Sequence, residues 1–447
     1  MEQNRKDINL LISLSVVVLL IFSLVILIGC SRSAKNEQTI EFWTIDLHPK
    51  FDDYINSLIA DFETTHTGLK IRWIDVPISA IHQKFIAAIA ARRTPDIINL
   101  NTDLALQFAE LGALTNLDKE ISKKVKDLYF PGLWQASYFK DNTGREGHYA
   151  FPWYVTTQLL IYNKQILTKT GLNPEKPPAT WETFWRSAKE VKARTGVYGV
   201  MPSIKFIDEL IMDGIPVVSP DRKKALFDHP DAIEKLKHYV ELYNKDEIPR
   251  ESIALGKSYQ RALEMYQGGN LGFLLTGPQF LNRIQDNAPS VYAATDVAPL
   301  PIGKAGIIPA ATMNLAIPLS SKHKDIAIEF ALFVTNSKNQ LLFCQIVPVL
   351  PSIQEAANDS FFLEWKKSQY QQANKAGNPE ISDQLLAKAR YLARKQLKIA
   401  RDLNLGLPRS KERSDVLREM LESALLGRRS PQDALTEGAR RWTLLLQ

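Results

Sequence analysis

The chain has 447 residues, of which 45% are hydrophobic and 23% are charged. This balance describes a globular body and excludes a disordered chain or a polytopic membrane protein, and the length allows two or more domains. The net charge of +6 arises after Phe361, where 17 Lys and Arg stand against 10 Asp and Glu. These charges alternate with apolar residues at helical spacing, so we interpret them as solvated helix faces and expect no nucleic-acid partner.

The first thirty residues have the pattern of an export signal. Arg5 and Lys6 precede an uncharged apolar run from Leu10 to Ile28, which nearly reaches the about 20 residues that span a bilayer. The run ends in Gly29 and Cys30, and residues 31–37 then form a polar linker. This resembles a bacterial lipobox, in which the cysteine is lipidated, although Ile28 stands where a small residue is more common. An uncleaved membrane anchor is the alternative, and both place the rest of the chain outside the cytoplasm, tethered to the outer face of the cell membrane.

Cys30 and Cys344 are the two cysteines of the chain. If Cys30 carries lipid, Cys344 has no partner, so no disulfide framework is expected. Cys344 follows an apolar run and is expected to be a buried, inert thiol.

The segment after the linker alternates strand and helix patterns. Alternating or short apolar runs predict strands, and apolar residues at i, i+3, i+4 and i+7 predict helices. The expected strands are Gln38–Trp43, Leu69–Val76 and Asp96–Leu100, and the expected helices are Phe51–Thr65 and Ile78–Arg92. This order is typical of a parallel sheet covered by helices, in which ligands bind beyond the carboxyl ends of the strands.

The rest of the chain mixes strands, turns and helices. Tyr149–Asn163 is rich in aromatic residues and is interrupted by Pro152, with a strand at Leu159–Tyr162. Thr180 opens a helix as half of a capping box, because Thr183 stands where Glu is usual. Strands are expected in Gly268–Pro278 and Ile308–Pro318, and helices in Ala232–Asn244, Ser258–Tyr266, Lys324–Thr335 and most of the tail after Pro351.

Several short motifs now occur in a fixed order: Ile40–Trp43, Thr94–Ile97, Phe151–Tyr154 with Ile161–Lys164, Thr180–Glu182, Thr276–Pro278 and Phe333–Asn336. Behind a lipobox, this order resembles the extracellular solute-binding proteins of ABC importers, in the branch similar to maltose-binding protein. The resemblance covers about residues 38 to 355. One departure is that Gln279 and Phe280 follow the Gly-Pro turn, where the family often has Trp.

The resemblance implies an α/β fold in which two lobes form a periplasmic-binding-protein clamp, with a hinge of about three crossings and a helical C-terminal tail. We expect residues 38–150 and 308–350 in lobe 1, and residues 151–307 and 351–447 in lobe 2. The crossings are expected at Tyr149–Pro152, Pro299–Pro309 and Pro348–Pro351, where proline and glycine accumulate. Closure around a ligand would be a hinge motion.

A sugar-binding site combines aromatic plates with short polar side chains. Residues at strand ends, after the first expected crossing and in the returning segment meet this description, although core packing or a turn role explains several of them equally well. Tyr162 and Trp181 are interpreted as packing residues, and Gln158 and Thr157 as a strand edge or hydroxyl-binding positions. The expected ligand-binding residues are Trp43, Thr44, Asn99, Asn101, Trp153, Tyr154, Thr156, Gly277, Met313 and Asn314.

Enzyme motifs are missing from the sequence. There is no Gly-x-Ser-x-Gly, His-Glu-x-x-His, P-loop or Cys-x-x-Cys, and the seven histidines are scattered. We therefore expect no catalytic residue, no metal site and no cofactor. The acid pairs Asp52–Asp53 and Asp208–Glu209 could suit a glycosidase, but adjacent helical residues point in different directions, so we interpret both pairs as solvated surface.

The sequence thus predicts a monomeric, non-enzymatic receptor that captures a sugar or oligosaccharide and delivers it to the permease of an ABC importer. The alternatives are a surface-anchored carbohydrate-active enzyme and a solute sensor that does not transport.

Overall fold

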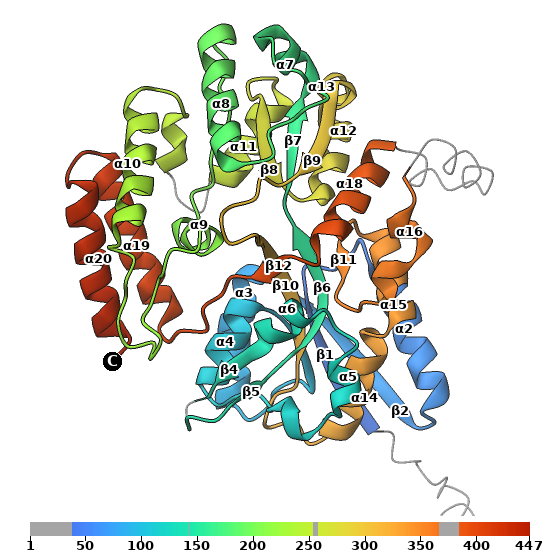
Figure 1. Ribbon diagram of the computed structural model, residues 1–447. Helices are drawn as coiled ribbons and strands as arrows, with labels where there is room; N and C mark the ends of the chain where they lie inside the picture. Colours follow the sequence, from blue (N-terminus) through green and yellow to red (C-terminus); the bar gives the residue numbers. More distant parts are fainter. Residues whose placement is uncertain (1–37, 142, 254–257, 366–383) are drawn as a thin grey trace, which may run out of the picture.

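The computed structural model describes residues 38–141, 143–253, 258–365 and 384–447, which form two α/β lobes and a helical arm (Figure 1). The predicted signal or anchor (residues 1–30), its lipidation at Cys30 and the linker (residues 31–37) lie outside the described residues. Within the described ranges, no helix is long and apolar enough to cross a membrane.

Lobe 1 is built on a seven-stranded sheet with the strand order β11-β6-β10-β3-β1-β2, in which β12 also pairs with β10. β1 is parallel to β2 and β3, whereas β10 is antiparallel to β3 and β6. The strands are β1 (Gln38–Ile45), β2 (Leu69–Val76), β3 (Ile97–Asn101), β6 (Phe151–Thr157), β10 (Ile308–Ala316), β11 (Leu350–Pro351) and β12 (Ala400–Asp402).

Helices of lobe 1 cover this sheet with the apolar faces that their sequences predict. α2 (Asp52–Thr65) buries Ile55, Leu58, Ile59 and Phe62, which follow the helical repeat. The predicted strand–helix–strand–helix–strand order is confirmed, with each boundary within two residues of the expectation. The other elements of lobe 1 are α3 (Ile78–Ala90), α4 (Thr102–Glu110), α5 (Lys123–Lys126), α6 (Pro131–Trp134), the hairpin β4 (Tyr138–Lys140) and β5 (Glu146–His148), α14 (Lys324–Val334), α15 (Ser337–Ile346) and α16 (Ser360–Leu363).

Lobe 2 is built on a three-stranded antiparallel sheet with the order β8-β7-β9. Its α8 begins with a complete capping box, because the Thr180 and Thr183 hydroxyls each accept a hydrogen bond from the other residue's backbone N–H. Threonine thus does what glutamate usually does, and the expectation of half a box is wrong. The elements are β7 (Leu159–Asn163), β8 (Phe273–Thr276), β9 (Thr295–Pro299), α7 (Lys164–Thr170), α8 (Trp181–Thr195), α9 (Phe206–Met212), α11 (Ser258–Gln267), α12 (Leu281–Asn287) and α13 (Pro289–Ala294).

A helical arm extends lobe 2, and its helices come from two parts of the chain that are far apart in the sequence. α10 (Pro230–Asn244) packs with α19 (Ser410–Leu425) and α20 (Pro431–Leu445), and Figure 1 shows the three side by side. They bury one hydrophobic cluster, which includes Phe227, Leu236, Met420, Leu435 and Trp442. The predicted helical tail is therefore present, with β12 as a short strand within it.

The connections between the lobes differ in part from the expected positions. β6 pairs with β10 in the larger sheet, so the chain passes to lobe 2 at residues 157–159 and not at Tyr149–Pro152. The return between β9 and β10 falls at residues 300–307, inside the expected Pro299–Pro309. After β11, α18 (Gln384–Gln396) lies against β9, then β12 rejoins the larger sheet and residues 403–409 lead to the arm. Each lobe therefore contains segments that are distant in sequence.

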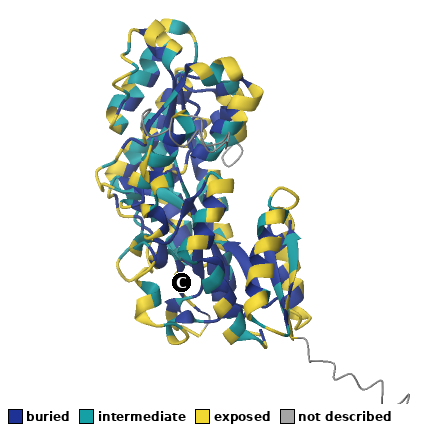
Figure 2. Cartoon of the chain, turned by 90° about the vertical axis from the view of Figure 1, so that its right-hand side faces the viewer, coloured by how far each residue is buried: buried dark blue, intermediate teal, exposed yellow. Residues whose placement is uncertain are grey.

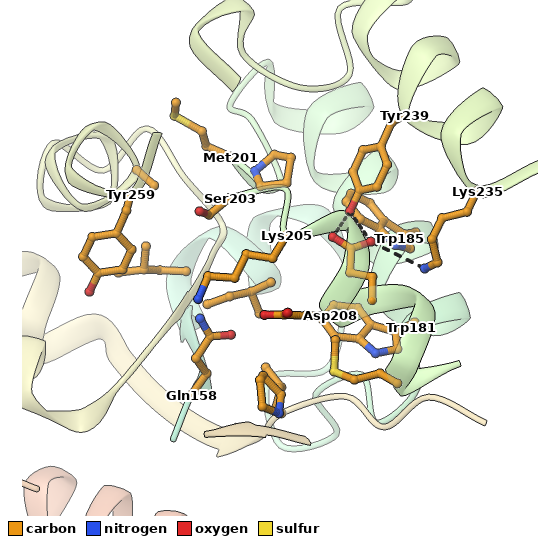
Figure 3. A pocket seen from close by; sticks show the side chains of 18 of the residues that line it. Gln158, Trp181, Trp185, Met201, Ser203, Lys205, Asp208, Lys235, Tyr239 and Tyr259 are labelled. Atoms are coloured by element: carbon orange, nitrogen blue, oxygen red, sulfur yellow. Dashed lines mark hydrogen bonds and ion pairs between the residues drawn. The ribbon is translucent and has the colours of Figure 1, made fainter. Parts of the chain in front are cut away.

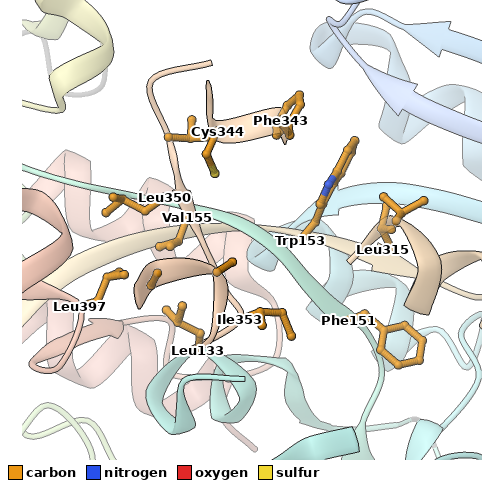
Figure 4. Packing of buried hydrophobic residues seen from close by; sticks show 14 of the residues in the cluster. Leu133, Phe151, Trp153, Val155, Leu315, Phe343, Cys344, Leu350, Ile353 and Leu397 are labelled. Carbon is orange, nitrogen blue, oxygen red and sulfur yellow. The ribbon is translucent and has the colours of Figure 1, made fainter. Parts of the chain in front are cut away.

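The largest hydrophobic cluster extends from lobe 1 into lobe 2. Figure 4 shows its part around Trp153, whose ring stacks on Phe343 at 5.2 Å between ring centroids. Cys344 lies here at 2% exposure, and burial raises the pKa of its thiol, so the expected buried thiol is confirmed. In the side view of Figure 2, buried residues follow the sheets and exposed residues follow the outer helices.

Candidate ligand-binding cleft

One wall of the cleft is formed by residues 201–213 of lobe 2. Phe206 and Leu210, one helical turn apart on α9, are buried in the cluster of the arm. This packing fixes α9 with Asp208 and Glu209 toward a hollow of about 800 Å³, open solvent included. α9 ends at Met212, and Gly214, two residues later, has a φ of +72°, a left-handed conformation that favours glycine.

The hollow combines aromatic rings with polar groups. Figure 3 shows Asp208 in its middle, with Lys205, Ser203 and Gln158 around it and the indole of Trp181 nearby. An apolar ring face beside short polar side chains is the arrangement that a sugar requires. The aromatic and sulfur-containing lining residues are Trp181, Trp185, Met201, Met212, Tyr239 and Tyr259.

A half-buried ion-pair cluster forms part of this wall. The Tyr239 hydroxyl donates to both carboxylate oxygens of Glu209 at 2.9 Å, and Lys235 contacts Glu209 at 3.5 Å and Asp213 at 3.0 Å. Burial raises the pKa of Glu209. Burial alone would lower the pKa of Lys235, but the two carboxylates outweigh it and raise that pKa. The cluster is internally paired, so it stabilises the wall.

The opposite wall comes from lobe 1 and from the strand β12. A second hollow, of about 620 Å³ with open solvent included, is lined by Asn101 and Asp103 of lobe 1, by β10 and by Asp402 and Asn404. Lys205 and Asp208 line both hollows. The two hollows therefore meet at these two side chains and form one cleft between the lobes.

Hydrogen bonds orient the acidic groups of the lobe 1 wall. The Thr102 hydroxyl donates to Asp402 Oδ2 at 2.5 Å, and the Asn404 side-chain amide donates to Asp103. Burial, with smaller contributions from the carboxylates of Asp103 and Asp208, raises the pKa of Asp402 to about 6.

Asp208 differs from these groups in its contacts. Burial raises the pKa of Asp208, Lys205 opposes this and Asp103 adds to it. Among the described residues, neither Asp208 nor Lys205 has a hydrogen-bond or ion-pair partner. Two charged side chains therefore face the cleft with their bonding capacity unused, which is what a ligand with many hydroxyls needs.

Of the residues expected to bind ligand, Asn101 lines the cleft. It also caps α4, because its Oδ1 accepts a hydrogen bond from Leu104 N at 2.8 Å. Met313 and Tyr154 lie half-buried opposite one another on β10 and β6, and Thr156 lies half-buried farther along β6. Gly277 is buried and follows Thr276, whose hydroxyl bonds to the cleft residue Tyr259.

The other expected residues are buried in lobe 1. Trp43 is 4% exposed and packs on Phe85, and Trp153 is 0% exposed, so neither indole presents a face to the cleft. Thr44 donates to Asp75 at 2.5 Å and accepts from Trp73 at 2.7 Å. Asn99 and Asn314 are buried in the centre of the sheet. The side-chain amide of Asn99 donates to the backbone carbonyl of Asn314 at 3.0 Å.

For several residues that line the cleft, the sequence predicted a different role. Asp208 and Glu209 were expected to be solvated surface, but both line the hollow, and Glu209 is bonded inside it. Trp181, expected to pack at a helix start, lines the hollow while also packing on Phe184. A sequence signal existed in Glu209 and Asp213, whose i, i+4 spacing directs them to one side of a helix that also buries apolar residues.

Comparison with known proteins agrees with this architecture. The model of the bacterial extracellular solute-binding protein family matches residues 48–341. The chain belongs to this family. The fold is accordingly the two-lobe clamp of periplasmic binding proteins, whose members act outside the cytoplasm.

Individual relatives are similar over most of their length. A solved structure from Synechococcus sp. MITs9220, described as a candidate oligosaccharide periplasmic-binding protein, is 30% identical with a TM-score of 0.76, covering 90% of this chain and 98% of that one. The diacetylchitobiose binding protein of Streptomyces coelicolor is 23% identical over 70% of this chain and 73% of its own. The sn-glycerol-3-phosphate-binding periplasmic protein of Escherichia coli is 25% identical over 93% and 94%.

Proposed function

We propose that the protein is an extracytoplasmic solute receptor that binds a sugar or oligosaccharide between its two lobes and delivers it to an ABC import permease. The observation that carries the proposal is the meeting of two hollows at Lys205 and Asp208. A ligand there would touch both lobes at once, and a ligand stabilises a closed clamp only through such contacts.

The chemistry of the cleft supports a saccharide as the ligand. Trp181 offers an apolar plate, and Asn101, Gln158, Ser203 and Asp208 offer donors and acceptors at the same hollows. The names of two relatives, which mention an oligosaccharide and diacetylchitobiose, point the same way. Membrane tethering through Cys30, a monomeric state and the permease partner belong to the same proposal, and the mass of the mature N-terminal peptide tests the lipidation.

The test is calorimetry with the purified full chain in mild detergent, against maltose, trehalose, sucrose and N,N′-diacetylchitobiose. We expect one-to-one binding of at least one saccharide, with the sugar recovered unchanged. Chromatography of the sugar after incubation distinguishes a receptor from a carbohydrate-active enzyme, since hydrolysis products would contradict the proposal. Binding without uptake in permease-reconstituted vesicles would leave the role of a sensor.

A further inference from the structure

The charged side chains that line the two hollows are predominantly acidic. Two lysines, Lys205 and Lys235, stand against five carboxylates, which are Asp103, Asp208, Glu209, Asp213 and Asp402. Such an excess of one sign in a cleft with low-dielectric walls focuses the electrostatic field into it.

The charge of Lys235 is balanced by neighbouring carboxylates of the wall. Its ammonium contacts Asp213 at 3.0 Å and Glu209 at 3.5 Å, so two carboxylates of the same wall face this one cation. Among the described lining residues, Lys205 is therefore the lysine without an ion-pair partner, and it lines the cleft together with Asp103, Asp208 and Asp402. Arg413 also acts on Asp103, but this residue is 6% exposed and its guanidinium donates to the carbonyls of Leu407 and Pro408, so it does not project into the cleft.

The three carboxylates come from three different parts of the fold. Asp103 lies in the first turn of α4, Asp208 in the first turn of α9 and Asp402 at the end of β12. Two of them raise the pKa of a neighbour in addition to burial: Asp103 and Asp208 act on Asp402, and Asp103 acts on Asp208. Their fields therefore converge on the space between the lobes.

We propose that Asp103, Asp208 and Asp402 act as a charge filter that admits uncharged and cationic saccharides and rejects phosphorylated or carboxylated ones. This inference rests on the proposed function and adds a specificity to it. A phosphate group would bring about two negative charges beside these three carboxylates and Lys205, and an unpaired like charge in a desolvated site is a strong basis for rejecting a ligand. The chain would then differ from the Escherichia coli relative, whose name states that it binds sn-glycerol 3-phosphate.

The experiment compares matched pairs of ligands on the full chain at pH 7.5 and low salt. Maltose and maltose 1-phosphate form one pair, trehalose and trehalose 6-phosphate another, and sn-glycerol 3-phosphate is tested alone. We expect each phosphorylated sugar to bind at least tenfold more weakly than its parent, with the ratio shrinking as salt rises. A phosphorylated sugar that binds as tightly as its parent overturns the filter and leaves the receptor proposal standing. Absence of binding by every saccharide overturns both.

A variant shows whether these carboxylates are responsible. The double substitution Asp103→Asn and Asp402→Asn keeps an oxygen that can accept from Asn404 and Thr102, so the local hydrogen bonds survive. We expect the double variant to reduce, at least threefold, the ratio of the dissociation constant of the phosphorylated sugar to that of its parent. The control, Asp286→Asn, lies exposed on α12 and should leave the ratio unchanged. An unchanged ratio in the double variant, with an unchanged melting temperature, overturns the assignment.

Discussion

Two tryptophans show how one residue type serves two purposes in this fold. Trp153 is fully enclosed, with its ring between Phe42 and Phe343, whereas Trp181 packs one edge on Phe184 and is half-buried beside the cleft. The sequence favoured Trp153 as the ligand-binding residue and Trp181 as the packing residue, because Trp153 directly follows Pro152 at an expected crossing between the lobes. Side chains alternate between the two faces of a strand, and Trp153 shares its face of β6 with Phe151 and Val155, which are buried with it in the largest hydrophobic cluster.

The roles of these two residues predict opposite effects of substitution. Trp153→Ala removes a large buried ring and should lower the free energy of unfolding by about 3–5 kcal/mol. Trp181→Ala should lower affinity for the best saccharide at least tenfold and change stability much less. Urea denaturation and calorimetry on both variants measure this. If Trp181→Ala binds the saccharide with unchanged affinity, the indole of Trp181 does not stack on the ligand.

At the scale of an element, α9 forms part of the cleft wall although it is only seven residues long. Its buried face packs into the arm, its acids face the hollow, and its end is fixed by Gly214, with Ile215 N bonded to Leu210 O at 2.8 Å. Isolated helices of this length are unstable, so tertiary packing holds α9 in place.

This arrangement predicts a specific effect of Gly214→Ala. A methyl group at Gly214 meets no atom within 4 Å, so the cost comes from the positive φ alone and should be about 1–2 kcal/mol. Since the change strains the end of α9, we also expect saccharide affinity to fall severalfold. Gly427→Ala is the matched control: its φ is +68°, its surroundings are equally open and it follows α19, away from the cleft lining. Equal stability losses with equal affinity losses would contradict this role of α9.

The elements also show what the sequence could predict. β2 has the expected bounds, and α2, α10 and α14 begin within two residues of them, because long periodic patterns report the buried face directly. Asn101 was identified as a cleft residue by its place at a strand end. Lys205 and Asp208 could not be found in this way, since their direction depends on contacts of α9 with α10 and α19, which are distant in sequence.

At the scale of the whole molecule, the acidic groups near the lobe boundary couple stability to pH. Burial raises the pKa of Asp402 to about 6 from 3.8, and of Glu110 to about 7 from 4.5, and it also raises the pKa of Asp103 and Asp208. A carboxyl whose pKa is higher in the folded state binds protons more tightly there. Its stabilising contribution is complete below the unfolded pKa and is lost as pH rises through the folded one.

We therefore expect these groups to make the protein less stable at pH 7.5 than at pH 5. For Asp402 alone, the shift corresponds to at most about 3 kcal/mol between pH 4 and pH 7.5. Asp402→Asn removes the titrating group but keeps an acceptor for Thr102, so its unfolding free energy should depend less on pH between 5 and 7. Asp286→Asn, exposed on α12, should follow the wild-type curve. Urea denaturation at half-unit pH steps gives the unfolding free energy of all three chains. If the curve for Asp402→Asn runs parallel to that of the wild type, the Asp402 carboxyl does not contribute to the pH dependence of stability.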